Sequence, residues 1–256
     1  MTSIKSKTLK LDYFSSMKAF FNLMKPRVMS LVIFTCAVGL LIAPVKINFV
    51  DAICSLMAVA LGSGAAGALN MWYESDLDSL MTRTCLRPIP TGKLTKNQAL
   101  IFGVLSSIIS VVALYIFSIL IASITLAVTI LFYVFVYTIW LKRKTAQNIV
   151  IGGAAGALPP VIGWAIATNG ISLEPIILFL IIFFWTPSHF WALSLYKTED
   201  YRKARIPMLP ITSGVKTTKF NIFIYSLILF PTVLLPYFFN FFGLVYLIAT
   251  TIMSLY

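Results

Sequence analysis

The chain has 256 residues, of which 59% are hydrophobic and 11% are charged, with a formal net charge of +12 and a mean hydropathy of +0.93. Soluble domains carry about twice that charged fraction, so the composition excludes an ordinary soluble globular protein. In a soluble protein so positive a charge would suit nucleic-acid binding, but in a chain this apolar it points first to a membrane.

Apolar stretches of about 20 residues recur along the whole chain, and each is long enough to cross the hydrocarbon core of a bilayer. This recurrence predicts an all-α fold, a polytopic transmembrane helical bundle with about eight spans. No linker interrupts the series, so a single integral-membrane domain is predicted over residues 1–256. The predicted spans cover residues 28–44, 50–73, 97–116, 119–140, 148–167, 173–196, 218–236 and 239–256.

The stretch before residue 28 is polar and basic and lacks the apolar core and cleavage site of a signal peptide, so no removable signal is expected. The three cysteines, Cys36, Cys54 and Cys85, are scattered without the paired spacing of metal ligands. Neither a disulfide framework nor a zinc site is predicted.

The basic residues are distributed very unevenly between the two sets of loops. Nineteen of the twenty Lys and Arg residues precede the first predicted span or follow an even-numbered one, and only Lys46 lies in an opposite loop. The positive-inside rule therefore places the N-terminus and the basic loops in the cytoplasm. This distribution explains the net charge without nucleic acid. A bacterial inner membrane is the expected location, and a mitochondrial inner membrane is the alternative.

The second predicted span runs into a cluster of acidic residues, with Asn70, Glu74 and Asp78 four positions apart. On a helix each step of four advances about 400°, so the three oxygen-bearing side chains form one stripe. Such a stripe suits Mg²⁺, which binds through carboxylates and substrate phosphates. Asp76 points elsewhere on an ideal helix but joins the ligands if the helix frays.

A plainer alternative is that these acids are solvated at the helix end or pair with nearby arginines. Ionisable groups at membrane depth are costly and usually functional, which favours a metal–diphosphate site. A diphosphate also needs cationic groups. The candidate cations are Arg83, Arg87, Lys142, Arg143 and Lys197. For Arg83, Arg87, Lys142 and Arg143, the charge alone fits two roles equally well: binding a diphosphate, or fixing the cytoplasmic end of a span by the positive-inside rule.

A second polar segment follows the sixth predicted span. Tyr196 and Asp200 stand four residues apart with Lys197 and Glu199 between them, a mixed cluster of phenol, lysine and carboxylates. His189, the only histidine, lies inside that span. A lone histidine is more often a hydrogen-bonded structural group than a ligand, although a membrane helix adds the alternative of axial coordination to a haem iron.

These segments together resemble a known family. "NMWYESDLDSLMTRTCLRPIPTG" (70–92) is similar to the first aspartate-rich motif of the intramembrane aromatic prenyltransferase superfamily, N-x-x-x-D-x-x-x-D. "LMKPRV" (23–28), "YTIWLKRKTAQNIVIGGAAGALPPVIGW" (137–164) and "TPSHFWALSLYKTEDYRKARIPMLP" (186–210) follow in the family's order. The last stretch looks like the haem-farnesylating branch, the haem O synthases (protohaem IX farnesyltransferases).

The resemblance implies a helical bundle around a central cavity that transfers a farnesyl group from farnesyl diphosphate to the 2-vinyl group of haem b. Mg²⁺ is the implied cofactor, and haem b is a substrate. By similarity the metal ligands are Asn70, Glu74, Asp76 and Asp78, and Tyr196 and Asp200 join the catalytic groups. Substrate-binding positions carried over by the same likeness are Arg83, Arg87, Tyr137, Lys142, Arg143, Asn148, Lys197 and His189.

Two features depart from the family pattern. Glu74 stands where the family has aspartate. The family has nine spans, whereas this sequence stops in or just after an eighth, which fits a truncated sequence or a shortened member. Another aromatic acceptor such as 4-hydroxybenzoate is the nearest alternative function. A transporter fits less well, because its key charges lie near the bilayer midplane. Association with haem A synthase is a further expectation.

Overall fold

The computed structural model describes residues 13–255, and the helical character predicted for the chain is confirmed over that range. The helices are α1 (Tyr13–Leu23), α2 (Pro26–Ile42), α3 (Phe49–Tyr73), α4 (Ser75–Leu80), α5 (Lys96–Phe117), α6 (Leu120–Leu131), the π-helix η1 (Phe132–Leu141), α7 (Asn148–Ala157), α8 (Pro159–Thr168), α9 (Leu173–Tyr196), α10 (Thr198–Lys203), α11 (Leu209–Thr212), α12 (Gly214–Phe238) and α13 (Leu244–Leu255).

The number of spans in the described residues is smaller than the eight predicted. Six helical segments are long and apolar enough to cross a membrane, and α1 with α2, bent by 50°, makes a seventh if the pair counts as one span. The predicted span 239–256 forms α13, which has only 12 residues. α12 continues to Phe238, a turn follows with Asn240 at a φ of 59°, and α13 runs from Leu244 to Leu255, the last residue described. A helix of 12 residues is shorter than a bilayer crossing requires.

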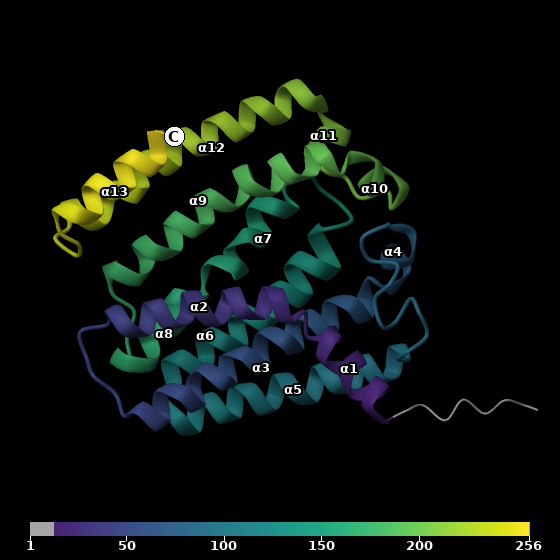
Figure 1. Ribbon diagram of the computed structural model, residues 1–256, viewed down its shortest axis with the longest axis horizontal. Coiled ribbons are helices and arrows are strands. Elements are labelled where there is room, and N and C mark those ends of the chain that lie inside the picture. Colours follow the sequence, from purple (N-terminus) through teal and green to yellow (C-terminus); the bar gives the residue numbers. More distant parts are fainter. Residues whose placement is uncertain (1–12, 256) are drawn as a thin grey trace, which may run out of the picture.

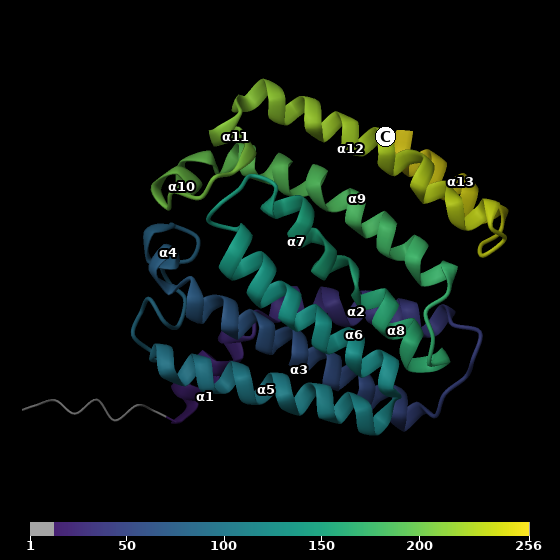
Figure 2. The same cartoon turned by 180° about the vertical axis from the view of Figure 1, so that it is seen from behind.

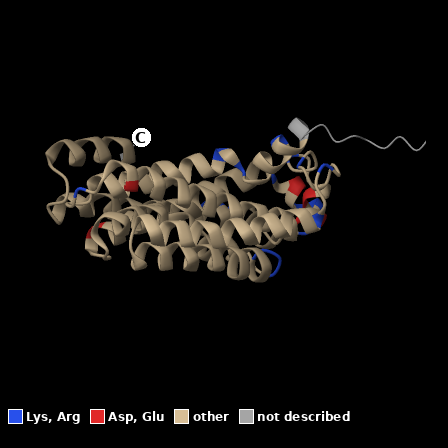
Figure 3. Ribbon diagram, turned by 90° about the horizontal axis from the view of Figure 1, so that it is seen from below, with Lys and Arg blue, Asp and Glu red and all other residues tan. Residues whose placement is uncertain are grey.

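The helices lie side by side in a bundle (Figures 1 and 2). In both views α9, α12 and α13 form one side of the bundle, α3, α5 and α6 form the other, and α7 lies between them. Charged residues gather at the end that carries α1 and α4 (Figure 3). This end therefore corresponds to the basic face predicted from the loops.

Two prolines divide the predicted span 148–167 into α7 and α8. The break falls at Leu158, immediately before Pro159 and Pro160. Proline has no backbone N–H and its ring clashes with the preceding turn, so a straight helix cannot pass through this pair. The change of direction lets α7 pack against α9 while α8 packs against α2.

The packing of α2 on α8 is close enough to need glycine on both helices. A Cβ added at Gly39 would overlap the carbonyl group of Pro160, and one added at Gly163 would overlap the carbonyl group of Cys36. Small residues allow such backbone approach between membrane helices.

Replacing Gly163 by alanine is expected to lower the free energy of unfolding by about 2 kcal/mol, because the two backbones must separate to admit the methyl group. Gly156→Ala on α7 is the control, since a Cβ there meets no heavy atom within 4 Å. Unfolding in mixed detergent–SDS micelles measures both variants. Equal stability of the two would contradict the close contact of α2 with α8.

Candidate active site

A cavity of about 630 Å³ opens near the charged end of the bundle. Its polar end is formed by charged and amide side chains, and the rest of its wall is apolar. The charged, amide and phenolic lining residues are Lys25, Asn70, Glu74, Asp78, Arg83, Arg87, Tyr133, Tyr137 and Lys142, and the hydroxyl residues Thr35 and Thr186 also line the cavity. Such a cavity can hold an anionic group at one end and a hydrophobic body at the other.

The predicted stripe of oxygen-bearing side chains lines this cavity. α3 ends and α4 begins at Glu74: the Glu74 N–H donates to the Asn70 carbonyl (2.9 Å) as the last bond of α3, and the Asp78 N–H donates to the Glu74 carbonyl (2.8 Å) as the first bond of α4. Although the helix is interrupted there, all three side chains line the same cavity. All are buried, with exposed fractions of 1% for Asn70, 2% for Glu74 and 3% for Asp78.

Each carboxylate of the stripe pairs with a cation that also lines the cavity. Lys142 Nζ lies 2.5 Å from Glu74 Oε2, and Arg87 Nη1 lies 2.8 Å from Asp78 Oδ1. The other carboxylate oxygen of Glu74, Oε1, is buried and has no hydrogen-bond partner among the described residues. Burying a carboxylate oxygen without a hydrogen-bond partner costs free energy, so Glu74 Oε1 is a candidate atom for binding a ligand.

The π-helix η1 and the residue that follows it place Tyr133, Tyr137 and Lys142 in the cavity lining. Its backbone bonds are wide, and the Lys142 N–H donates to the carbonyl of Tyr137 five residues earlier. π-helical turns inside longer helices often occur at functional sites. The Tyr133 and Tyr137 rings stand with centroids 5.3 Å apart, and Lys142 Nζ lies 5.6 Å from the Tyr137 centroid.

Lys25 is a cavity residue that the sequence argument did not select. It stands between α1 and α2 at a φ of 55°, a left-handed conformation that is unfavourable for a side chain larger than glycine. Its Nζ lies 2.5 Å from Asn70 Oδ1, and Asn70 Nδ2 donates to Thr138 Oγ1 at 3.0 Å. The signal available in the sequence was the segment "LMKPRV" (23–28), which contains Lys25 and belongs to the family resemblance.

The donor set fits a hard divalent cation bound together with a phosphate ligand. No group of three or more His, Cys, Asp or Glu side chains stands ready to hold a metal within residues 13–255. Glu74 and Asp78 nevertheless offer carboxylates to one cavity, and Glu74 Oε1 lacks a partner there. Mg²⁺ typically takes one or two carboxylates and completes its shell with water and substrate phosphates, which matches this set.

Asp76 and Arg143 lie outside the cavity lining and pair with each other. Arg143 Nη2 is 2.8 Å from Asp76 Oδ1, and the guanidinium also lies 4.9 Å from the Tyr73 ring centroid. Partial burial works to raise the pKa of Asp76, but the hydrogen bond and charge of Arg143 outweigh it and leave the pKa below its ordinary value. Their predicted roles toward metal and diphosphate stay predictions.

The predicted residues of the second polar segment do not line the main cavity. Tyr196, Lys197 and Asp200 border a separate surface hollow, and the exposed fraction of Tyr196 is 86%. His189 is exposed and stacks on Trp185 with ring centroids 4.3 Å apart. Asn148 is buried and donates to the Thr145 carbonyl.

Asp200 instead connects the two polar segments of the sequence. Thr82 Oγ1 donates to its carboxylate at 2.8 and 2.9 Å, and this hydrogen bond holds the pKa of Asp200 below its ordinary value. Beside it, the Arg83 guanidinium lies 5.9 Å from the Tyr201 ring centroid. Both contacts join the segment after α4 to α10, and Arg83 also reaches the cavity.

Comparison with known proteins identifies relatives over most of the chain. Residues 32–256 match the UbiA prenyltransferase family. The chain is 65% identical over 255 residues to a protoheme IX farnesyltransferase of Pelagibacter ubique (strain HTCC1062), covering 100% of this chain and 84% of the relative. It is 54% identical over 233 residues to a protoheme IX farnesyltransferase of Ehrlichia ruminantium (strain Welgevonden), covering 91% of this chain and 79% of the relative.

A solved structure shares the fold. A UbiA homologue from Archaeoglobus fulgidus bound to DMAPP and Mg²⁺ superposes with a TM-score of 0.75 at 15% identity, over 93% of this chain and 83% of that chain. Fold and cavity together define a polytopic membrane protein that encloses a charged pocket within an apolar bundle. The chain belongs to the UbiA prenyltransferase family, which confirms the superfamily resemblance drawn from its motifs.

Proposed function

We propose that this prenyltransferase moves the farnesyl group of farnesyl diphosphate onto the 2-vinyl group of haem b. Support comes from the names of relatives that are 54% to 65% identical to this chain and from the cavity. One observation carries the proposal: the buried stripe Asn70–Glu74–Asp78 and its paired cations share a cavity with a long apolar wall. A diphosphate and a prenyl chain need those two environments side by side.

The diphosphate is bound by the basic residues of the cavity, two of which, Lys142 and Arg87, pair with Glu74 and Asp78. Lys142, Arg87 and Arg83 line the polar end, and Lys25 joins them from the bend before α2. Fixed positive groups at a departing diphosphate stabilise the charge that develops as the allylic C–O bond breaks. Mg²⁺ bound by Glu74 and Asp78 would add Lewis-acid stabilisation of the same charge. The Tyr133 and Tyr137 rings lie where their negative faces can stabilise the allylic cation.

The acceptor half of the reaction forms one C–C and one C–O bond. The terminal carbon of the 2-vinyl group bonds to C1 of the farnesyl cation, which leaves a positive charge on the vinyl carbon next to the porphyrin ring. Water adds to that carbon and loses a proton, so the products are a hydroxyethylfarnesyl haem, diphosphate and one proton. The apolar wall, which includes Trp185 and Phe190, is where the flat porphyrin packs.

The same proposal covers the setting of the enzyme. The chain is an integral membrane protein, and its charge distribution supports a bacterial inner membrane with the polar cavity end on the cytoplasmic side. Farnesyl diphosphate would then arrive from the cytoplasm and the bilayer. Association with haem A synthase and axial coordination of haem iron by His189 stay predictions.

The mass of the product tests the proposed function. Purified protein in lipid nanodiscs with Mg²⁺, farnesyl diphosphate and haem b is expected to yield haem that has gained one farnesyl group and one hydroxyl group. The parallel reaction with 4-hydroxybenzoate is expected to give no product. A farnesylated benzoate together with unchanged haem would overturn the haem assignment in favour of another aromatic acceptor.

A further inference from the structure

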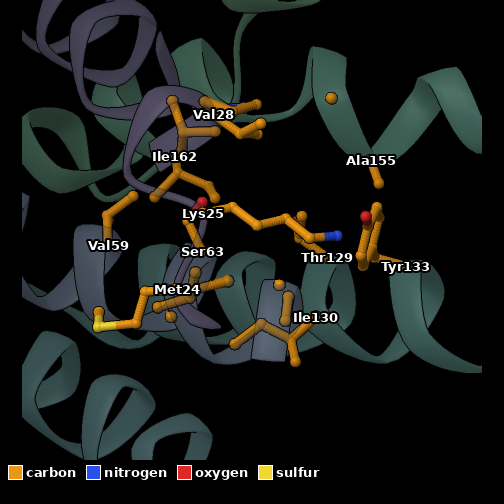
Figure 4. Close-up of a pocket in the computed structure, with 17 residues that line it drawn as sticks. Met24, Lys25, Val28, Val59, Ser63, Thr129, Ile130, Tyr133, Ala155 and Ile162 are labelled. Atoms are coloured by element: carbon orange, nitrogen blue, oxygen red, sulfur yellow. The ribbon is translucent and has the colours of Figure 1, made fainter. Parts of the chain in front are cut away.

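A second, narrower cavity lies beside the main one. Its volume is about 120 Å³, and α2, α3, α6 and the α7–α8 segment surround it (Figure 4). Lys25 is the only charged residue in its lining, and most of the other lining residues are apolar or glycine. No residue of the proposed diphosphate site except Lys25 borders this side pocket.

The side pocket joins the main cavity at a shared rim. Lys25, Val28, Val32, Tyr133 and Gly156 line both cavities. In Figure 4 the Lys25 side chain extends across the pocket toward Tyr133 and Thr129. A Cβ built at Gly156 would meet nothing within 4 Å, so the rim has open space at that position. The two cavities therefore adjoin at these residues, which is where a flexible apolar chain would enter the side pocket.

The pocket extends away from the charged end of the bundle and ends at residues of the buried hydrophobic core. Its lining on α3 runs from Gly67 back to Val59, and Val59 lies about 16 Å along the helix axis from Asn70 at 1.5 Å per residue. Leu126 of α6 and Ile162 of α8 complete the floor. These three residues are almost fully buried, with exposed fractions of 0% for Val59, 3% for Leu126 and 1% for Ile162.

We infer that Val59, Leu126 and Ile162 set the length of the prenyl chain, by closing the pocket that receives its distal end. This inference rests on the proposed function, since it takes the diphosphate to lie at Lys25 and the Asn70–Glu74–Asp78 stripe. The axial distance from stripe to floor is close to the extended length of a farnesyl chain. A longer chain meets the floor, and a shorter chain leaves the pocket partly empty, so both lose packing.

Leu126→Ala tests the floor directly. It is expected to raise binding of geranylgeranyl relative to farnesyl thiodiphosphate at least about tenfold, because removing side-chain volume from a close-fitting pocket changes discrimination by that order. Competition binding in nanodiscs with Mg²⁺ measures the ratio without any acceptor. The matched control is Leu131→Ala on the same helix, whose side chain is 53% exposed and does not line the pocket.

Gly156→Val tests the rim at a position where an added Cβ meets no heavy atom within 4 Å. Its side chain narrows the passage, so affinity for farnesyl thiodiphosphate is expected to fall more than affinity for the geranyl compound. Unchanged ratios in both folded variants would overturn the inference while leaving the proposed function intact. A different outcome would overturn only the acceptor assignment. In that case Leu126→Ala changes the preference between the thiodiphosphates as expected, but the original protein transfers no farnesyl group to haem.

Discussion

Asp78→Ala is expected to lower prenyl transfer by at least about 10²-fold while the protein remains folded in the membrane. The Asp78 carboxylate lines the main cavity and pairs with Arg87, so its loss removes one proposed metal ligand and frees a cation at the proposed diphosphate site. Arg87 keeps an exposed fraction of 21%, which allows water to solvate the freed guanidinium. Product formation at saturating farnesyl diphosphate measures the effect, and detergent unfolding checks the fold.

The control lies two residues earlier on the same helix. Asp76→Ala removes a carboxylate that is 54% exposed and bonded to Arg143 outside the cavity lining. Its effect on turnover is expected to stay within a few-fold, because a surface ion pair contributes little. Near wild-type turnover of Asp78→Ala would remove the metal role of the stripe. A loss in Asp76→Ala as large as that in Asp78→Ala would show that Asp76 is a ligand after all.

The stripe was predictable because it depends on one short-range regularity. Oxygen-bearing residues four apart share a helix face, and Asn70, Glu74 and Asp78 still line one cavity although the helix breaks at Glu74 between α3 and α4. The placement of Lys142 followed in a similar way, since a basic residue that ends a span on the same side must lie at the same membrane depth. The all-α bundle followed from the length and spacing of the apolar segments alone.

Other features depend on contacts that spacing does not encode. Lys25 reaches the cavity because the backbone turns between α1 and α2 at a left-handed residue, and no periodicity predicts that turn. Asp200 meets Thr82 across 118 residues of sequence, so only the folded chain shows which loop receives its carboxylate. A turn at residues 239–243 interrupts the apolar run of the eighth predicted span, and hydropathy does not register such a turn.

Breaking the Lys142–Glu74 pair is expected to be the most destabilising change at the site. Lys142→Met leaves the Glu74 carboxylate buried and uncompensated, and the free energy of unfolding should fall by about 3 kcal/mol. Glu74→Gln should cost less, because Lys142 has an exposed fraction of 15% in the pair and can reach water along its flexible stem. Unfolding in mixed detergent–SDS micelles gives both values.

The double variant Glu74→Gln with Lys142→Met separates stability from chemistry. With both charges gone, the desolvation penalty disappears, so its stability should recover to within about 1 kcal/mol of the original protein. Prenyl transfer should nevertheless stay as low as in Glu74→Gln, because a neutral amide does not replace a carboxylate ligand beside diphosphate. If activity returned together with stability, the pair would serve only to hold η1 against α3, and Glu74 would have no part in binding metal.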